Sequence, residues 1–286
     1  MLTLSKRIAA LTFAAVVTSA VGAETTEAQR REAAPFAWEG AIASGQALEI
    51  KGVNGQIRAT PASGNTVRVE ATRSARRSDP SEIDIVVLEH AGGVTVCAVY
   101  PSSLMRENEC APGDAGRISA RNNDTQVEFT VQVPAGVDFV GQTTNGSVIA
   151  DNLSGHVMAY STNGDVEIDG GRTVHARTTN GSVTIRSAGE ADARTTNGRI
   201  RAYLQSLDGS GPLNFSTTNG SITLGLPASA NVNVDASTTN GRISSDLPIT
   251  VTGSIGRNRL AGTIGSGGRE IRLRTTNGGI DLQTEG

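Results

Sequence analysis

The stretch TVHARTTNGSVTIRS, residues 173–187, decides the fold, because it holds one complete copy of a motif that recurs along the chain. Apolar residues stand six and four positions before the asparagine, at Val174 and Ala176, and three and five positions after it, at Val183 and Ile185. Apolar residues that alternate with other residues, at a spacing of two positions, lie on one face of a β-strand. Each copy therefore predicts a strand, a TTNG corner and a second strand.

The corner recurs at nearly constant intervals. From residue 145 to residue 240 the intervals between successive corner asparagines are 18, 17, 17, 22 and 21 residues. A fixed period of this kind is the signature of a repeat architecture. Asparagine and glycine both tolerate positive φ, so we interpret the pairs as structural corners with a left-handed residue. The corner asparagines are Asn54, Asn145, Asn163, Asn180, Asn197, Asn219, Asn240 and Asn277.

Two architectures share this pattern. Asn-Gly is also the strongest short signal for a two-residue β-hairpin, and hairpin pairing would place the same residues on one face. The two threonines before the asparagine favour stacked coils, because stacking rewards repetition of the whole corner. We expect an all-β protein, a β-solenoid similar to a single-stranded β-helix, with an irregular β-rich N-terminal part.

The first residues have the layout of a secretory signal peptide. Lys6 and Arg7 precede an apolar run over residues 8–22, which ends in small residues at Ala23. This pattern predicts cleavage after residue 23, and a retained membrane anchor is the alternative. We expect an exported protein that is periplasmic, held at the cell surface or secreted.

The remaining chain divides by pattern into three parts. Residues 24–35 lack an apolar face and predict a flexible leader. Residues 36–140 alternate without a clean period, which predicts a β-rich N-terminal subdomain or a set of first coils. Residues 141–286 form the TTNG-repeat solenoid.

The net charge and the hydropathy of the chain limit the classes of partner that it is expected to bind. The formal net charge is -3, and removal of the two positive charges of the signal changes it to -5. This mild acidity argues against nucleic acid and anionic membranes as partners. No stretch after the signal reaches the length of a membrane helix, so we expect no integral membrane segment after cleavage.

The two cysteines of the chain are Cys97 and Cys110. In an oxidising compartment such a pair predicts one structural disulfide, and a functional thiol is the alternative.

The residues that carry chemistry predict neither catalysis nor a metal or cofactor site. Glycoside hydrolysis needs two carboxyl groups about 5 to 10 Å apart, whereas the acidic residues of the repeats fall at scattered offsets from the corner. The histidines His90, His156 and His175 lack partners at metal-ligand spacing. The scattered acidic residues are Asp151, Asp165, Glu167, Asp192, Asp208, Asp235 and Asp246.

Two surface features are candidates for binding. Tyr160 and Tyr203 are potential aromatic anchors, whereas Phe139 and Phe215 stand at buried offsets. The second threonine of each corner faces outward, so the stack is expected to carry a flat rank of hydroxyl groups suited to a polymer or to ice. This threonine file comprises Thr144, Thr162, Thr179, Thr196, Thr218, Thr239 and Thr276.

Three segments resemble bacterial domains of the DUF4097 type, whose family label is putative adhesin. They are the run VPAGVDFVGQTTNGSV at 133–148, the repeated TTNG units, and LAGTIGSGGREIRLRTTNGGIDL at 260–282. The resemblance covers most of residues 40–284. It implies an exported β-solenoid of the cell envelope and supplies no catalytic residues.

Together these features predict a non-enzymatic module that binds an envelope or extracellular macromolecule, either protein or polysaccharide. The alternatives are a structural or envelope-stress component without a dedicated ligand, and a carbohydrate-active β-helix enzyme. Exposed end coils also leave self-association open.

Overall fold

The computed structural model describes residues 30–102, 107–187, 189–209, 211–251 and 256–285. The predicted signal peptide and residues 24–29 of the predicted leader lie outside the described residues. Within the described ranges no helix is long and apolar enough to cross a bilayer.

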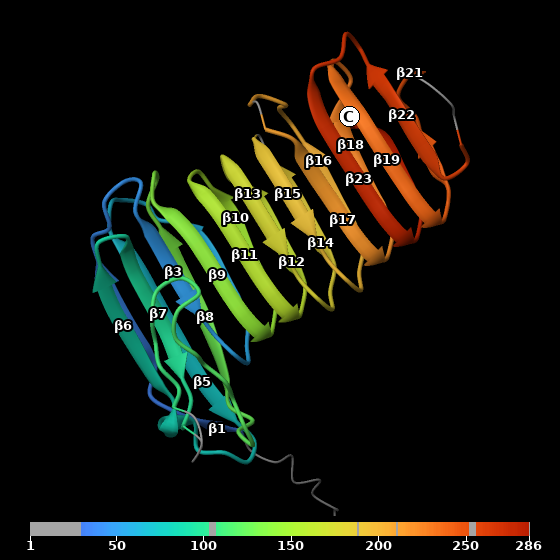
Figure 1. The fold of residues 1–286 in the computed structure, drawn as a ribbon. Helices are drawn as coiled ribbons and strands as arrows, with labels where there is room; N and C mark the ends of the chain where they lie inside the picture. The colour runs from blue at the N-terminus through green and yellow to red at the C-terminus, as the bar shows by residue number, and fades with distance from the viewer. Residues whose placement is uncertain (1–29, 103–106, 188, 210, 252–255, 286) are drawn as a thin grey trace, which may run out of the picture.

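The described chain folds into two facing 12-stranded sheets that form one elongated stack, as Figure 1 shows. Sheet A contains the strands that follow the corners together with β1, β2 and β5, in the spatial order β1-β5-β8-β4-β10-β12-β14-β16-β18-β24-β20, with β2 beside β5. Sheet B contains the strands that precede the corners together with β6, β21 and β22, in the order β21-β22-β19-β23-β17-β15-β13-β11-β9-β3-β7-β6.

The strands of sheet A have these bounds: β1 Arg31–Glu32, β2 Phe36–Gly40, β4 Ile57–Pro61, β5 Val67–Ala75, β8 Gln126–Val133, β10 Val148–Leu153, β12 Val166–Gly170, β14 Val183–Ser187, β16 Ile200–Leu204, β18 Ile222–Pro227, β20 Ile243–Ser245 and β24 Ile280–Glu285. The strands of sheet B are β3 Ala47–Lys51, β6 Asp84–His90, β7 Gly93–Val99, β9 Asp138–Asn145, β11 His156–Asn163, β13 Thr173–Arg177, β15 Glu190–Arg194, β17 Leu213–Asn219, β19 Val232–Asn240, β21 Ile249–Val251, β22 Arg259–Ile264 and β23 Arg269–Asn277. A short 3-10 helix, Pro80–Glu82, precedes β6.

The pairing pattern confirms the solenoid. Strands joined by a TTNG corner do not pair with each other; β13 pairs in parallel with β11 and β15, and β14 pairs in parallel with β12 and β16. The register is exact from coil to coil, since Val166 lies beside Val183 and Val183 beside Ile200. A hairpin would instead have joined β13 to β14 in antiparallel fashion.

The core fills the space between the two sheets. The apolar positions that flank each corner are buried, including Val174, Ala176, Val183 and Ile185, each with no exposed surface. One hydrophobic cluster extends from Ile42 to Leu282. The boundary placed near residue 140 falls inside β9, and the core continues across it.

The N-terminal part contributes coils and antiparallel strands to the same stack. β3 and β4 form a coil around Asn54, and β7 and β8 pair in parallel with its outer side. β5 and β6 then run antiparallel to β8 and β7. The leader is not flexible throughout, because β1, at residues 31 and 32, pairs with β5 through backbone hydrogen bonds.

The coils do not follow one another in chain order at either end. The Asn54 coil lies between β7 and β9, although β7 follows it in sequence. At the other end, β23 of the Asn277 coil lies between β17 and β19. The Gly-rich segment before β23 contains β22, a strand antiparallel to β19. Residues 252–255 of that segment lie outside the described residues.

Each corner is bonded to its neighbours through three groups. The first threonine of a corner donates its hydroxyl to a glycine carbonyl of the adjacent coil, as Thr178 Oγ1 does to Gly164 O at 2.8 Å. The glycine N–H donates to the next asparagine carbonyl, as Gly181 N does to Asn197 O at 3.0 Å. The asparagine side chains form an unbroken amide ladder, in which every Nδ2 to Oδ1 distance is 2.7 or 2.8 Å. The ladder runs Asn54, Asn145, Asn163, Asn180, Asn197, Asn219, Asn277, Asn240.

The expected left-handed residue is absent from six of the eight corners. Among the described residues the non-glycine residues with positive φ are Asn122 and Asn152, and neither is a corner residue. Of the corner glycines, Gly55 and Gly278 have positive φ. Close stacking, rather than backbone conformation, excludes a side chain: a Cβ at Gly181 would lie 2.1 Å from Gly164 O.

Gly181→Ala is expected to lower the free energy of unfolding by about 2 kcal/mol or more, because the coils must separate to admit the methyl group. Gly64→Ala is the matched control, since a Cβ there meets nothing within 4 Å, and it should change stability by less than about 0.5 kcal/mol. Urea denaturation followed by circular dichroism measures both. Equal stability of the two variants would contradict the stacking argument.

Asn180→Ala removes two ladder hydrogen bonds, whereas Asn240→Ala at the end of the ladder removes one. With about 1 kcal/mol per bond, we expect the interior variant to lose about twice the stability of the terminal one. The same denaturation experiment compares them, and a terminal loss as large as the interior loss would show that the ladder bonds are not the cause.

Candidate functional site

A long connection distinguishes one corner from all the others. Between β7 and β8, where other coils have four corner residues, the chain makes an excursion, which the structure describes at residues 100–102 and 107–125. Its end returns to the corner position, since Thr125 O accepts the side-chain N–H of Asn54 at 3.3 Å. The Tyr100 hydroxyl also donates to Thr125 O, at 2.8 Å, so both roots of the excursion are tied together. Burial raises the pKa of Tyr100 to about 12.

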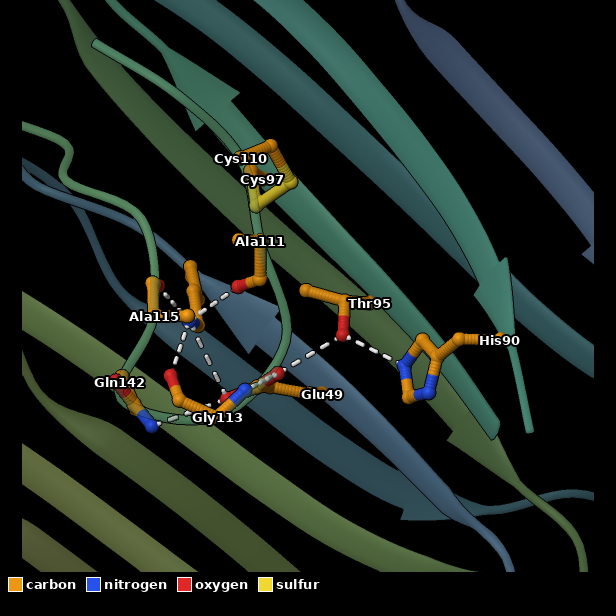
Figure 2. Close-up of a disulfide and its surroundings, with 10 residues drawn as sticks. Glu49, His90, Thr95, Cys97, Cys110, Ala111, Gly113, Ala115 and Gln142 are labelled. Atoms are coloured by element: carbon orange, nitrogen blue, oxygen red, sulfur yellow. Dashed lines mark hydrogen bonds and ion pairs between the residues drawn. A yellow bond between two sulfur atoms is a disulfide. The ribbon is translucent and has the colours of Figure 1, made fainter. Parts of the chain in front are cut away.

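The predicted disulfide holds this excursion, which we call the stapled loop, against sheet B. Cys97 of β7 is bonded to Cys110, with a Cα–Cα distance of 5.8 Å. Asn108 braces the loop internally, because its amide donates to the carbonyls of Tyr100 and Ser119, each at 2.9 Å. The loop therefore lies over the outer face of β3 (Figure 2).

Two charged side chains under the stapled loop fix its position. Glu49 and Lys51 point outward from β3, yet they are only 6% and 8% exposed because the loop covers them. Lys51 Nζ donates to the carbonyls of Ala111 at 2.5 Å, of Ala115 at 3.3 Å and of Gly113. Glu49 Oε2 accepts the Gly113 N–H at 3.0 Å.

Glu49 also joins the loop to the neighbouring strands. Its Oε2 accepts the hydroxyl of Thr95 at 2.8 Å, and its Oε1 accepts the amide of Gln142 at 3.1 Å. Lys51 Nζ lies 3.6 Å from Glu49 Oε1. These contacts, drawn in Figure 2, occupy both carboxylate oxygens, which suits an anchor better than a proton-transfer group.

The stapled loop forms one wall of a cleft on the outer face of sheet B. The cleft has a volume of about 560 Å³. Val140 and Met158 provide an apolar floor, Asp114 lies on the loop side, and Tyr160 and Arg177 lie on the neighbouring strands β11 and β13. Partial burial raises the pKa of the Tyr160 hydroxyl. That hydroxyl therefore stays protonated at neutral pH, so it can donate a hydrogen bond.

Two smaller hollows adjoin this cleft. One, of about 340 Å³, lies between Arg117 on the loop and Tyr160, Thr144 and Thr162 on the sheet. The other, of about 300 Å³, begins at Arg177 and continues past Asp192 and Arg194. One hollow shares Tyr160 with the cleft and the other shares Arg177, so the three lie next to one another across successive strands. We call this path, formed by the cleft and the two hollows, the sheet-B groove.

Arginines with different roles line the groove. Arg177 and Arg194 lie side by side in register and are exposed, and within the described chain neither forms an ion pair. Arg274, further along the same row, is held by Asp235 at 2.5 Å. Arg177 and Arg194 are thus available to an oxygen-rich ligand.

The structure separates the two tyrosines proposed as anchors. Tyr160 lies on sheet B in the groove, whereas Tyr203 lies on β16 of sheet A, on the opposite face of the stack. Arg186 stands over the Tyr203 ring at 5.1 Å from its centre, and a Cβ at Gly225 would lie 2.6 Å from that ring. Tyr203 therefore covers a glycine of its own sheet, and the pair forms no common site.

The predicted threonine file lies along the corner edge of sheet B. Six of its members are exposed, and Thr144 is half-buried beside the stapled loop. In space the file follows the coils, so Thr276 stands between Thr218 and Thr239. Thr144 and Thr162 border the groove, and the remaining threonines extend from it along one edge.

The histidines and acidic residues are spread over both sheets, and His175 lies beside Asp192 in register. His90 contacts Thr95 at 3.0 Å, and His156 contacts Arg172 at 2.8 Å. Asp151 pairs with Arg58 on sheet A, while Asp235 pairs with Arg274 on sheet B. Among the described residues no three metal-ligating side chains gather in one place.

Sequence patterns missed the buried pair Glu49 and Lys51. Both alternate along the strand with the inward-facing Leu48 and Ile50, so they occupy outward positions, where charged residues are ordinary. Their burial depends on the stapled loop, whose path over sheet B has no periodic signal.

Comparisons with known proteins agree with the repeat pattern. The family model described as Toastrack DUF4097 matches residues 111–283. No curated protein matches the chain. One similar solved structure, described as a putative cell adhesion protein from Clostridium sporogenes ATCC 15579, is 12% identical and covers 88% of this chain and 100% of its own, with a TM-score of 0.35. Another, described as a putative adhesin from Bacteroides fragilis NCTC 9343, is 10% identical and covers 88% and 97%, with a TM-score of 0.37.

Replacement of both cysteines, Cys97→Ser with Cys110→Ser, is expected to loosen the stapled loop while the stack stays folded. The Gly113 amide, which donates to Glu49, should then exchange its hydrogen much faster, because opening the loop no longer strains a covalent link. The Gly181 amide, far away in the stack, is the internal reference. Hydrogen exchange measured by NMR or mass spectrometry tests this, and unchanged protection of Gly113 would show that the polar contacts alone hold the loop.

Proposed function

The chain belongs to the DUF4097 (Toastrack) family, and on this premise we propose that it is an exported, non-enzymatic binding module of the bacterial cell envelope. The proposal places the partner in the sheet-B groove. It is carried by one observation: a half-buried tyrosine, Tyr160, and Arg177, an arginine without an ion pair among the described residues, stand on adjacent strands beside a wall held by a disulfide.

Export is supported by the disulfide and by the N-terminal pattern. Disulfides persist in oxidising compartments outside the cytoplasm, and Cys97 and Cys110 are joined here. Residues 1–23 have the layout of a secretory signal. Measurement of the N-terminal residue of the protein recovered from cells tests the cleavage.

The groove favours a polysaccharide as the partner. An aromatic ring offers its face to the C–H face of a sugar, while arginine, aspartate and asparagine side chains bond to hydroxyl groups in fixed directions. Tyr160 supplies the ring, and Arg177, Asp192 and Asn214 supply the polar groups along the path. The hollows follow each other across parallel strands spaced about 4.8 Å apart, so a linear polymer can lie along the stack.

A binding role is favoured over catalysis by the state of the carboxylates. Glu49, which borders the cleft, is engaged with Thr95, Gly113, Gln142 and Lys51. A glycosidase requires two carboxyl groups on either side of the scissile bond, and both carboxylate oxygens of Glu49 already accept hydrogen bonds.

Tyr160→Ala is expected to weaken binding of envelope polysaccharide by about tenfold or more, as for a central aromatic anchor, and Arg177→Ala should have a similar effect. Tyr203→Ala on the opposite face is the matched control and should bind normally. Purified polysaccharide fractions from the source cells, titrated by calorimetry below the unfolding temperature of each variant, provide the measurement.

Four outcomes would contradict the proposal. Equal loss in the Tyr160 and Tyr203 variants would remove the groove from consideration. Capture that disappears after protease treatment of the envelope fraction would identify a protein partner instead. Capture of nothing by the native protein would favour the structural role, and sugar release from the fractions would favour an enzyme.

A further inference from the structure

The eight Asn-Gly pairs carry a chemical liability as well as a structural role. In such a pair the glycine backbone nitrogen attacks Cγ of the asparagine side chain, the C–N bond of the amide breaks and ammonia leaves. Water then opens the resulting succinimide ring to aspartate or isoaspartate. Glycine permits this reaction best, because no Cβ obstructs its nitrogen. The reaction requires a free glycine N–H and a mobile asparagine side chain.

At seven of the eight corners the glycine N–H is hydrogen-bonded, so its nitrogen is not free to attack the asparagine side chain. In each of these corners the glycine N–H donates to the asparagine carbonyl of the next coil, at 2.8 to 3.1 Å. The seven donors are Gly55, Gly146, Gly164, Gly181, Gly198, Gly220 and Gly278. Ring closure there would break a hydrogen bond between coils and pull the corner out of register.

The eighth pair, Asn240–Gly241, stands at the end of the ladder. Its coil is the last of the TTNG coils in space, because the Asn277 coil lies on its inner side. Within the described part of the chain, Gly241 N has no acceptor, and both Asn240 and Gly241 are exposed. A hollow bordered by Thr239, Gly241, Arg242 and Asn258 opens beside this corner.

The side chain of Asn240 is also held less firmly than the others. Interior ladder asparagines donate through Nδ2 and accept through Oδ1, as Asn180 does. Asn240 donates to Asn277 Oδ1 at 2.8 Å, but within the described residues its own Oδ1 accepts nothing. One hydrogen bond, rather than two, therefore restrains the carbonyl carbon that the glycine nitrogen attacks.

We propose that Asn240 is the deamidation site of the native protein. The aspartate product has no donor for Asn277 Oδ1, so the last bond of the amide ladder is replaced by repulsion between oxygens. The isoaspartate product inserts a methylene group into the backbone between β19 and β20. It shifts the register in which Ile243 lies beside Ile280. Chemical ageing therefore begins at the C-terminal cap of the stack and spares the groove.

The test incubates the purified native protein at mildly alkaline pH and follows each Asn-Gly pair by proteolysis and mass spectrometry. Asn240 should deamidate at least about tenfold faster than each of the other seven, the ratio expected when they react only after a local opening that costs about 1.4 kcal/mol. In denaturant with a reducing agent, the eight rates should become similar. The Asn240→Gln variant, which keeps a side-chain amide but closes a ring poorly, should lose the fast phase.

Three results would overturn the inference. A different Asn-Gly pair could lead the native reaction, or all eight could react at one rate in the folded protein. A fast phase that persists in Asn240→Gln would have the same meaning. These outcomes do not depend on polysaccharide binding, so the two proposals fail or survive separately.

Discussion

The whole molecule depends on a close approach of backbones at the corners. The carbonyl oxygen of one corner glycine nearly occupies the position that a Cβ of the next corner glycine would take. A Cβ at Gly198, for example, would lie 1.8 Å from Gly181 O. This contact sets the strand spacing that allows the threonine, glycine and asparagine groups of neighbouring corners to bond together. Because every bond runs between coils, no coil has a satisfied corner by itself, and order in one coil requires order in the next.

That constraint explains which parts of the fold the sequence could predict. Apolar residues at a spacing of two, such as Val174 and Ala176, identified the buried strand faces, and repetition of the threonines separated coils from hairpins. The alternation of apolar residues shows which face of a strand is buried, but it carries no information about which coil lies beside which. The position of the Asn277 coil between the Asn219 and Asn240 coils therefore could not be inferred. The corner conformation was misjudged for a related reason: both positive φ and close contact select glycine, and sequence does not distinguish them.

The candidate site was less accessible to sequence reasoning than the fold. Tyr160 and Tyr203 looked equivalent in the repeat, yet the frame places one on each sheet, and only Tyr160 meets the stapled loop. The loop itself is aperiodic, so neither its path nor the burial of Glu49 and Lys51 followed from the pattern. A periodic scaffold thus supplies a regular face, and a single irregular insertion provides the difference that makes one part of that face concave.

The displaced coil at the C-terminal end has a consequence for folding kinetics. When residues 213–245 have formed, the Asn219 coil presents an edge whose native neighbour, the Asn277 coil, has not yet folded. The Asn240 coil carries the same apolar frame and the same corner, so it can dock on that edge in a regular but non-native order. The native arrangement requires this contact to open and β23 to enter between β17 and β19. Sequence similarity between coils, which makes the stack easy to extend, thereby also makes a non-native order of coils compatible with the same corner contacts.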